Sequence, residues 1–97
     1  MNKRVVMTIG INDLIERKVL SQKDLFLNLG KFINNDWGIL CDEDKEFQNE
    51  LVKNPNSKNY ERFMGVYLIN EIKIWIIREY DYSIDSLIFT ILLPDEY

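Results

Sequence analysis

The chain has 97 residues, of which 46% are hydrophobic and 29% charged, with a net charge of −4 and a pI near 4.8. This composition excludes a disordered chain and predicts a single domain over residues 1–97. The negative charge and scattered basic residues argue against direct nucleic-acid binding, which needs a basic patch to displace counterions from phosphates.

The residue types present also limit the chemistry. Cys41 is the one cysteine and there is no histidine, so neither an internal disulfide nor a zinc site of the usual kind can form. The apolar stretch after Lys3 and Arg4 is too short for a signal peptide, and no run approaches the roughly 20 apolar residues that span a bilayer. We expect a cytoplasmic protein with no metal, no cofactor and no membrane contact.

Two helices are predicted in the first third of the chain. Residues 4–9 form a short strand or an extended lead-in to a helix over 11–18, whose apolar residues share one face. Ser21 is a good N-cap for the second helix, with Asp24 three residues later in an arrangement like a capping box. The apolar residues that follow, up to Ile33, recur at the spacing of an amphipathic helix.

A third helix is predicted to begin near Asp42, whose carboxylate can cap free backbone N–H groups. Phe47 and Leu51 lie one turn apart and are expected to form its buried anchor. Pro55 ends the helix, because the residue before a proline is pushed out of the helical region. Residues 56–59 are polar and are expected to be mobile.

The chain becomes strand-like after residue 61, with three runs rich in β-branched, aromatic and aliphatic residues at 62–69, 72–80 and 87–93. Asn70 and Glu71 have the right length for a two-residue hairpin turn. The predicted class is therefore α+β. About three helices, within 11–54, pack on a C-terminal three-stranded antiparallel β-meander within 61–93, and a short N-terminal strand remains an option.

The predicted sheet is apolar on both faces. In the middle strand Ile72, Ile74 and Ile76 point to one face, while Trp75 and Ile77 point to the other. One layer of helices can cover one face of a sheet this small. The second face must meet the N-terminal segment, a second copy of the chain in a homodimer, or a partner protein.

The most distinctive local pattern is the D-W-G loop at 36–38, followed by the acidic run at 42–44. As a recognition surface, it would present Trp37 as an aromatic anchor rimmed by carboxylates. In the alternative interpretation, Trp37 fills the core where two helices meet and the acids are ordinary first-turn residues.

Enzymatic interpretations are weaker. Three adjacent acids on one helical turn point in different directions and do not converge on a metal ion, and Cys41 has no histidine to activate it. A metal-independent nuclease that uses Glu79 and Asp81 is the enzyme alternative, against a surface cluster of turn residues. No catalytic residue is predicted.

Several motifs together resemble small proteins carried on plasmids and other mobile elements, usually labelled "plasmid-related". The family pattern is D-W-G, E-E-D-K, W-I-I-T-E-A-D-R and L-L-P-E-E-Y, and the matching segments here are 36–38, 41–45, 74–81 and 92–97. Three positions depart from it: Phe32 stands for a histidine, Arg78 for threonine and Tyr82 for arginine. These departures remove polar residues that a shared catalytic site would use.

The resemblance implies a setting on a mobile element, where small acidic proteins often protect the element by binding a nuclease. From this setting we expect a non-enzymatic protein that binds and inhibits a host defence nuclease complex, of the anti-CRISPR or anti-restriction type, through an acidic surface. The alternatives are a toxin–antitoxin or plasmid accessory binding protein and the small nuclease. The expected partner is a protein, such as a nuclease or nucleoprotein complex, and direct nucleic-acid binding is not expected. The predicted partner-binding residues are Asp36, Trp37, Asp42, Glu43, Asp44, Asp95 and Glu96.

Overall fold

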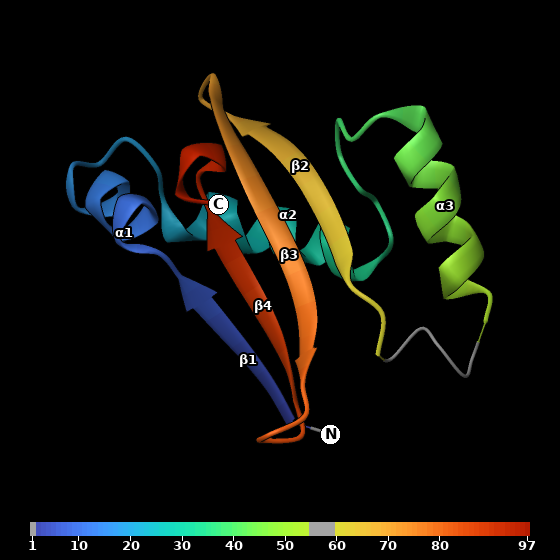
Figure 1. Ribbon diagram of the computed structural model, residues 1–97. Helices are drawn as coiled ribbons and strands as arrows, with labels where there is room; N and C mark the ends of the chain where they lie inside the picture. The colour runs from blue at the N-terminus through green and yellow to red at the C-terminus, as the bar shows by residue number, and fades with distance from the viewer. Residues whose placement is uncertain (1, 55–59) are drawn as a thin grey trace.

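The computed structural model describes residues 2–54 and 60–97, and Figure 1 shows the arrangement of their helices and strands. The class is α+β, as predicted. The expected mobile segment at 56–59 lies outside the described residues. In chain order the elements are β1 (Asn2–Met7), α1 (Ile9–Glu16), α2 (Gln22–Ile33), α3 (Asp42–Val52), β2 (Phe63–Ile69), β3 (Ile72–Asp81), β4 (Ser86–Leu92) and the 3-10 helix η1 (Pro94–Glu96).

The described strands form a four-stranded mixed sheet in the order β1-β4-β3-β2. The β2–β3 and β3–β4 pairs are antiparallel, but β1 pairs in parallel with β4, from Asn2 opposite Ser86 to Met7 opposite Ile91. The prediction of a three-stranded antiparallel meander is therefore wrong. The N-terminal segment is a fourth strand, so the first and the last strand of the chain are neighbours in the sheet.

Local sequence signals predicted approximately where the helices begin. Ser21 Oγ accepts a hydrogen bond from Asp24 N at 3.1 Å, as the predicted N-cap of α2. Thr8 caps α1, which therefore begins two residues before the predicted start. The N-cap of α3 is Cys41, so Asp42 lies in the first turn and is not the capping residue that we predicted.

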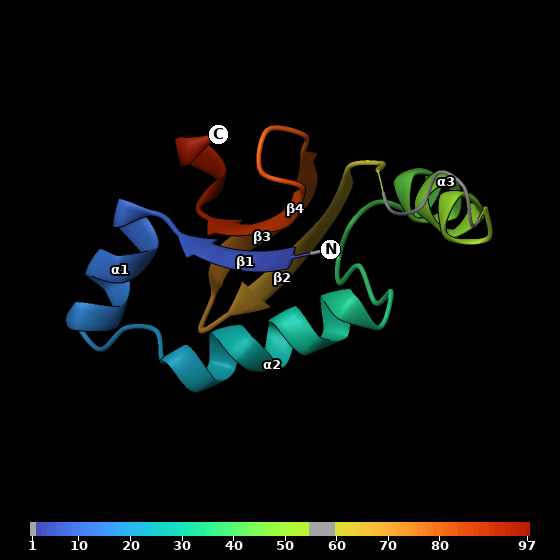
Figure 2. The same cartoon turned by 90° about the horizontal axis from the view of Figure 1, so that it is seen from below.

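Only part of the helical layer covers the sheet. Figure 2 shows α2 lying across one face, where Leu25, Leu29 and Phe32 are buried in the core. In both views α3 lies beside β2 at the edge of the sheet, so the prediction that all three helices pack on the sheet is wrong for α3.

The opposite face of the sheet is more open. The 3-10 helix η1 lies on this side (Figure 2) and brings Tyr97 edge-on to Trp75, with ring centroids 5.5 Å apart. Leu68 remains 58% exposed and Val6 45% exposed. The sequence analysis left open whether the N-terminal segment covers the second face of the sheet. It does not cover that face, because β1 joins the edge of the sheet.

A hairpin turn and a backbone bridge fix the position of β2. Asn70 and Glu71 both have positive φ, 50° and 67°, as the predicted two-residue hairpin turn requires. At the outer edge of β2, Val66 N donates to Trp37 O at 3.0 Å and Ile39 N donates to Val66 O at 2.7 Å. Gly38 between them has φ of 70°, and a Cβ there would lie 1.9 Å from Val66 O. Glycine is therefore required at this position.

Candidate functional site

The helix α3 is attached to the sheet edge by its inner side. The Gln48 amide pairs with the backbone of Met64 in both directions: Nε2 donates to Met64 O at 2.9 Å, and Met64 N donates to Oε1 at 2.8 Å. Gln48 is accordingly 7% exposed. Leu51 and Val52 pack against the core from the last turn. One side of the helix is therefore fixed, and the other faces solvent.

Trp37 belongs to this attachment and not to the surface. Its ring is 4% exposed, stacks on Phe63 with centroids 5.5 Å apart and meets Phe32 edge-on at 5.4 Å. The indole Nε1 donates to Asn49 Oδ1 on α3 at 2.9 Å. This corrects the interpretation of Trp37 as an exposed anchor, because its ring fills the junction between α2, β2 and α3.

The exposed aromatic of this region is Phe47, which we expected to be buried. Its side chain is 66% exposed, and it lines a shallow depression with Glu43, Glu46 and Glu50. We call these four residues the α3 acidic face. Glu50 also pairs with Lys53 at 3.2 Å, an exposed ion pair of the kind that contributes little. The arrangement of an aromatic ring among carboxylates is present, but at Phe47 and not at Trp37.

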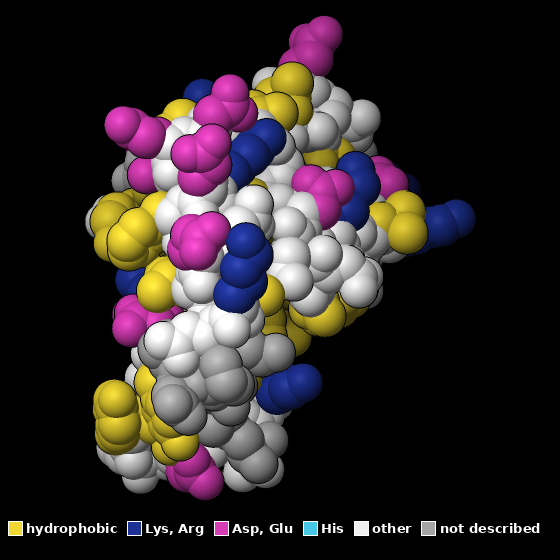
Figure 3. All heavy atoms as spheres, turned by 90° about the vertical axis from the view of Figure 1, so that its right-hand side faces the viewer, with side chains coloured by type: hydrophobic (Ala, Val, Ile, Leu, Met, Phe, Trp, Pro, Cys, Tyr) yellow, Lys and Arg dark blue, Asp and Glu magenta, His cyan; other side chains and the backbone are white. Residues whose placement is uncertain are grey.

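The charge of the molecule is concentrated on this helix. From Asp42 to Val52 there are five acidic residues and one basic residue, whereas the rest of the chain contains eleven of each. The net charge of −4 is thus the charge of α3. Figure 3 views the molecule from the α3 side and shows acidic side chains gathered over its upper part, with hydrophobic ones beside them.

The remaining acids predicted near this site have structural contacts. Asp36 Oδ1 accepts from Gly38 N at 3.0 Å, and its backbone oxygen accepts from the buried Tyr67 hydroxyl at 2.7 Å. Asp44 Oδ2 accepts from Cys41 Sγ at 3.1 Å. Asp42 and Asp44 both lie in the first turn of α3, where negative charge favours the helix. These acids shape the loop and the helix start, while Asp42 and Asp44 also add to the charge.

Asp95 and Glu96 lie at the other end of the molecule. Figures 1 and 2 place η1 near α1, well away from α3. Glu96 accepts from Thr8 Oγ1 at 2.6 Å and from the backbone N–H groups of Gly10 and Leu93 at 2.9 Å each. The hydrogen bond from Thr8, followed by those from Leu93 and Gly10, lowers the pKa of Glu96. The fold therefore does not bring these two acids to the α3 acidic face.

The enzyme alternative centred on Glu79 and Asp81. Both line a shallow hollow at the β3–β4 turn together with Tyr80. Side-chain and backbone hydrogen bonds from Ser83 lower the pKa of Asp81, and the hydrogen bond to Asp85 raises the pKa of Tyr80 to about 12. Both shifts move away from neutrality, which is unfavourable for general acid–base catalysis.

No family model, curated protein or solved structure matches this chain, so the resemblance to plasmid-related proteins stays a prediction. In the part of the chain that the structure describes, no helix is long and apolar enough to cross a membrane. The same residues contain no group of three or more histidine, cysteine, aspartate or glutamate side chains placed to hold a metal ion.

The exposure of Phe47 was not predicted, although the sequence contains a signal for it. Glu43 and Glu50 lie four residues before it and three after it, which places all three on one stripe of the helix. A phenylalanine between carboxylates on such a stripe faces water more readily than one with apolar neighbours. Gln48 gave no comparable signal, because its burial depends on the backbone of β2.

Proposed function

We propose that this protein is a non-enzymatic, cytoplasmic binding protein of a mobile element that docks through the α3 acidic face on the basic, nucleic-acid-binding surface of a host defence nuclease complex. The observation that carries this proposal is that the whole net charge of the chain belongs to one helix at the edge of the fold. A helix with its acids on the solvent side can approach a groove that normally holds phosphates.

The charges and the aromatic ring have separate roles in this interaction. Carboxylates steer the protein towards a positive surface and speed up the encounter. Phe47 at their centre supplies apolar area that excludes water once contact is made, as aromatic anchors do in protein interfaces. Glu43 and Glu46 flank that ring on the exposed side. The attachment through Gln48 and Trp37 keeps this helix rigid and so reduces the entropy lost on binding.

The test uses the tagged full chain to recover a nuclease or nucleoprotein complex from bacterial lysate. The purified complex is then bound to labelled nucleic acid in the presence of increasing amounts of the protein. We expect the wild-type protein to displace the nucleic acid, more strongly at low salt. Glu46→Lys and Phe47→Ala should each weaken displacement by about tenfold or more, as loss of a central contact does.

Glu16→Lys, at the end of α1, is the matched control, since it makes the same charge change on another exposed helix. Recovery of a toxin would assign the chain to the toxin–antitoxin alternative. Recovery of no nuclease or nucleoprotein complex, or equal displacement by wild type and both variants, would contradict the proposal.

A second candidate is self-association through the open face of the sheet. Leu68 and Val6 are exposed there on the two edge strands, while Val66, Ile77 and Leu92 on the same face are buried. Exposed apolar side chains on a sheet face are typical of an interface. A homodimer formed in this way would leave both α3 helices free to bind a partner.

A further inference from the structure

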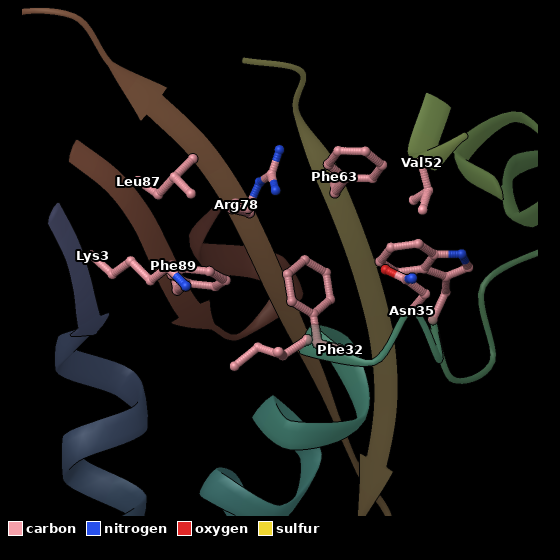
Figure 4. A pocket seen from close by; sticks show the side chains of 10 residues that line it. Lys3, Phe32, Asn35, Val52, Phe63, Arg78, Leu87 and Phe89 are labelled. Carbon is pink, nitrogen blue, oxygen red and sulfur yellow. The ribbon is translucent and has the colours of Figure 1, made fainter. Parts of the chain in front are cut away.

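A cavity of about 340 Å³ lies on the helix-covered side of the sheet, next to the C-terminal end of α2. Figure 4 shows its walls, to which α2, the sheet and the last turn of α3 all contribute. Ten residues line it, and none of the ten is acidic. Its aromatic lining comes from Phe32, Trp37, Phe63 and Phe89, and its two cations are Lys3 and Arg78.

The strand register explains why a cation lies among aromatic rings. Arg78 on β3 is directly opposite Phe63 on β2 and Phe89 on β4, so the three side chains form one row on the face that α2 covers. The last buried residue of α2 is Phe32, and the helix ends at Ile33. The row lies beyond this end of α2 (Figure 4), and the cavity lies against it.

The guanidinium of Arg78 is held in place by its surroundings. Its Cζ lies 4.5 Å from the centroid of Phe63, and its Nη2 donates to the backbone oxygen of Glu61 at 3.0 Å. Desolvation by burial lowers the pKa of Arg78. Lys3 adds a second positive charge from β1, opposite Leu87 on β4.

We propose that this cavity is a binding site for a small aromatic carboxylate, with its ring among the phenylalanine side chains and its carboxylate directed at Arg78 and Lys3. Two cations lie here over an apolar floor, with no acidic residue among the lining residues. A carboxylate can accept charge-assisted hydrogen bonds from a guanidinium and an ammonium group, and bonds of this type are among the stronger ones. The site includes Val52 from the last turn of α3, but it does not use the α3 acidic face or the partner proposed for that face.

The dimensions suit such a ligand. Apolar cavities of about 150 Å³ hold benzene, and ligand pockets usually measure about 300–1,000 Å³. A volume of about 340 Å³ therefore accommodates one ring with a short acidic arm. The purely structural alternative is that Arg78 serves to fix the backbone at Glu61, in which case the cavity has no preference for anions.

The experiment compares two ligands of nearly equal shape, phenylacetate and its neutral amide phenylacetamide, by NMR titration of the full chain. We expect phenylacetate to bind with half-saturation in the millimolar range and to shift the backbone amide signals of Asn35, Phe63 and Leu87. Phenylacetamide should bind about tenfold more weakly, because it lacks the charge that Arg78 and Lys3 recognise.

Variants then assign the charge preference to these side chains. Lys3→Gln and Arg78→Gln should each reduce the ratio of the two affinities severalfold. Lys73→Gln is the control, since this lysine lies on the same strand as Arg78 but on the opposite face and should leave the ratio unchanged. Lys3 is an exposed residue, so its variant remains informative even if Arg78→Gln unfolds.

The proposal fails on any of three results from wild-type protein alone. Equal affinity for phenylacetate and phenylacetamide would show that Lys3 and Arg78 do not favour the charged ligand over the neutral one. Shifts confined to residues away from the cavity would place the ligand elsewhere, and absence of saturation throughout the millimolar range would show that the cavity is not a ligand site.

Discussion

At the scale of single residues, Glu96 fastens the C-terminus to the start of α1. Its two carboxylate oxygens accept three hydrogen bonds, including one from Gly10 N. A Cβ at Gly10 would lie 2.7 Å from Glu96 Oε2, so glycine allows this close approach. The acid at position 96 thus has a structural role at the end of the chain, separate from any partner.

These hydrogen bonds predict a pH dependence of stability. The pKa of Glu96 is lower in the folded protein than in the unfolded chain, so its contribution is fully present above about pH 5 and is lost as the pH falls through the folded pKa. We expect Glu96→Gln to destabilise the protein at neutral pH and much less at about pH 3. Urea unfolding at both pH values measures this difference.

Asp95→Asn is the control for that measurement, since it removes the same charge from the neighbouring residue and keeps the three hydrogen bonds. A Glu96→Gln variant that loses the same stability at both pH values would show that the carboxylate charge is not what matters.

At the scale of secondary structure elements, α3 depends on Gln48 for its position. Its amide satisfies both the N–H and the C=O of Met64, much as a neighbouring strand would. Gln48→Ala leaves both groups without this partner, and we expect it to cost about 1–2 kcal/mol. Backbone amides of α3 should then exchange with solvent faster than those of α2, as hydrogen exchange measured by NMR can show.

Gln22→Ala, on the exposed first turn of α2, is the matched control and should leave exchange in α3 unchanged. If α3 amides in Gln48→Ala stay as protected as in the wild type, Trp37 and Leu51 are sufficient to hold the helix.

The same elements show how far the sequence can predict this fold. The α2 cap at Ser21 and the turn at Asn70 and Glu71 are local features, and local residues encode them. The partner of β1 is separated from it by almost the whole chain, so no local pattern reveals the parallel pair. Phe47 was expected to be buried because hydrophobicity alone was used, and no local signal indicated the polar contacts of Gln48 with β2 that position α3.

At the scale of the whole molecule, α2 covers one face of the sheet, and the more open second face bears on self-association. In the core between α2 and the sheet, Ile74, Ile76 and Ile91 are at most 1% exposed. The other face has η1 at one end and leaves Leu68 and Val6 to solvent. The small size of the chain limits the stability that its own core supplies, and burial of this face in a dimer would add to it.

We therefore predict a reversible dimer in solution. Sedimentation equilibrium should give a mass that rises with concentration from 11.6 kDa, the mass of one chain, towards twice that value. Leu68→Glu places a charge on the open face and should shift the protein to the monomer, because an unpaired charge is costly to bury. Leu27→Glu makes the same change at an exposed position of α2, on the far side of the sheet, and should leave the association unaltered. A wild-type protein that stays at the monomer mass at every concentration would exclude this use of the face, and the partner protein would then remain its expected cover.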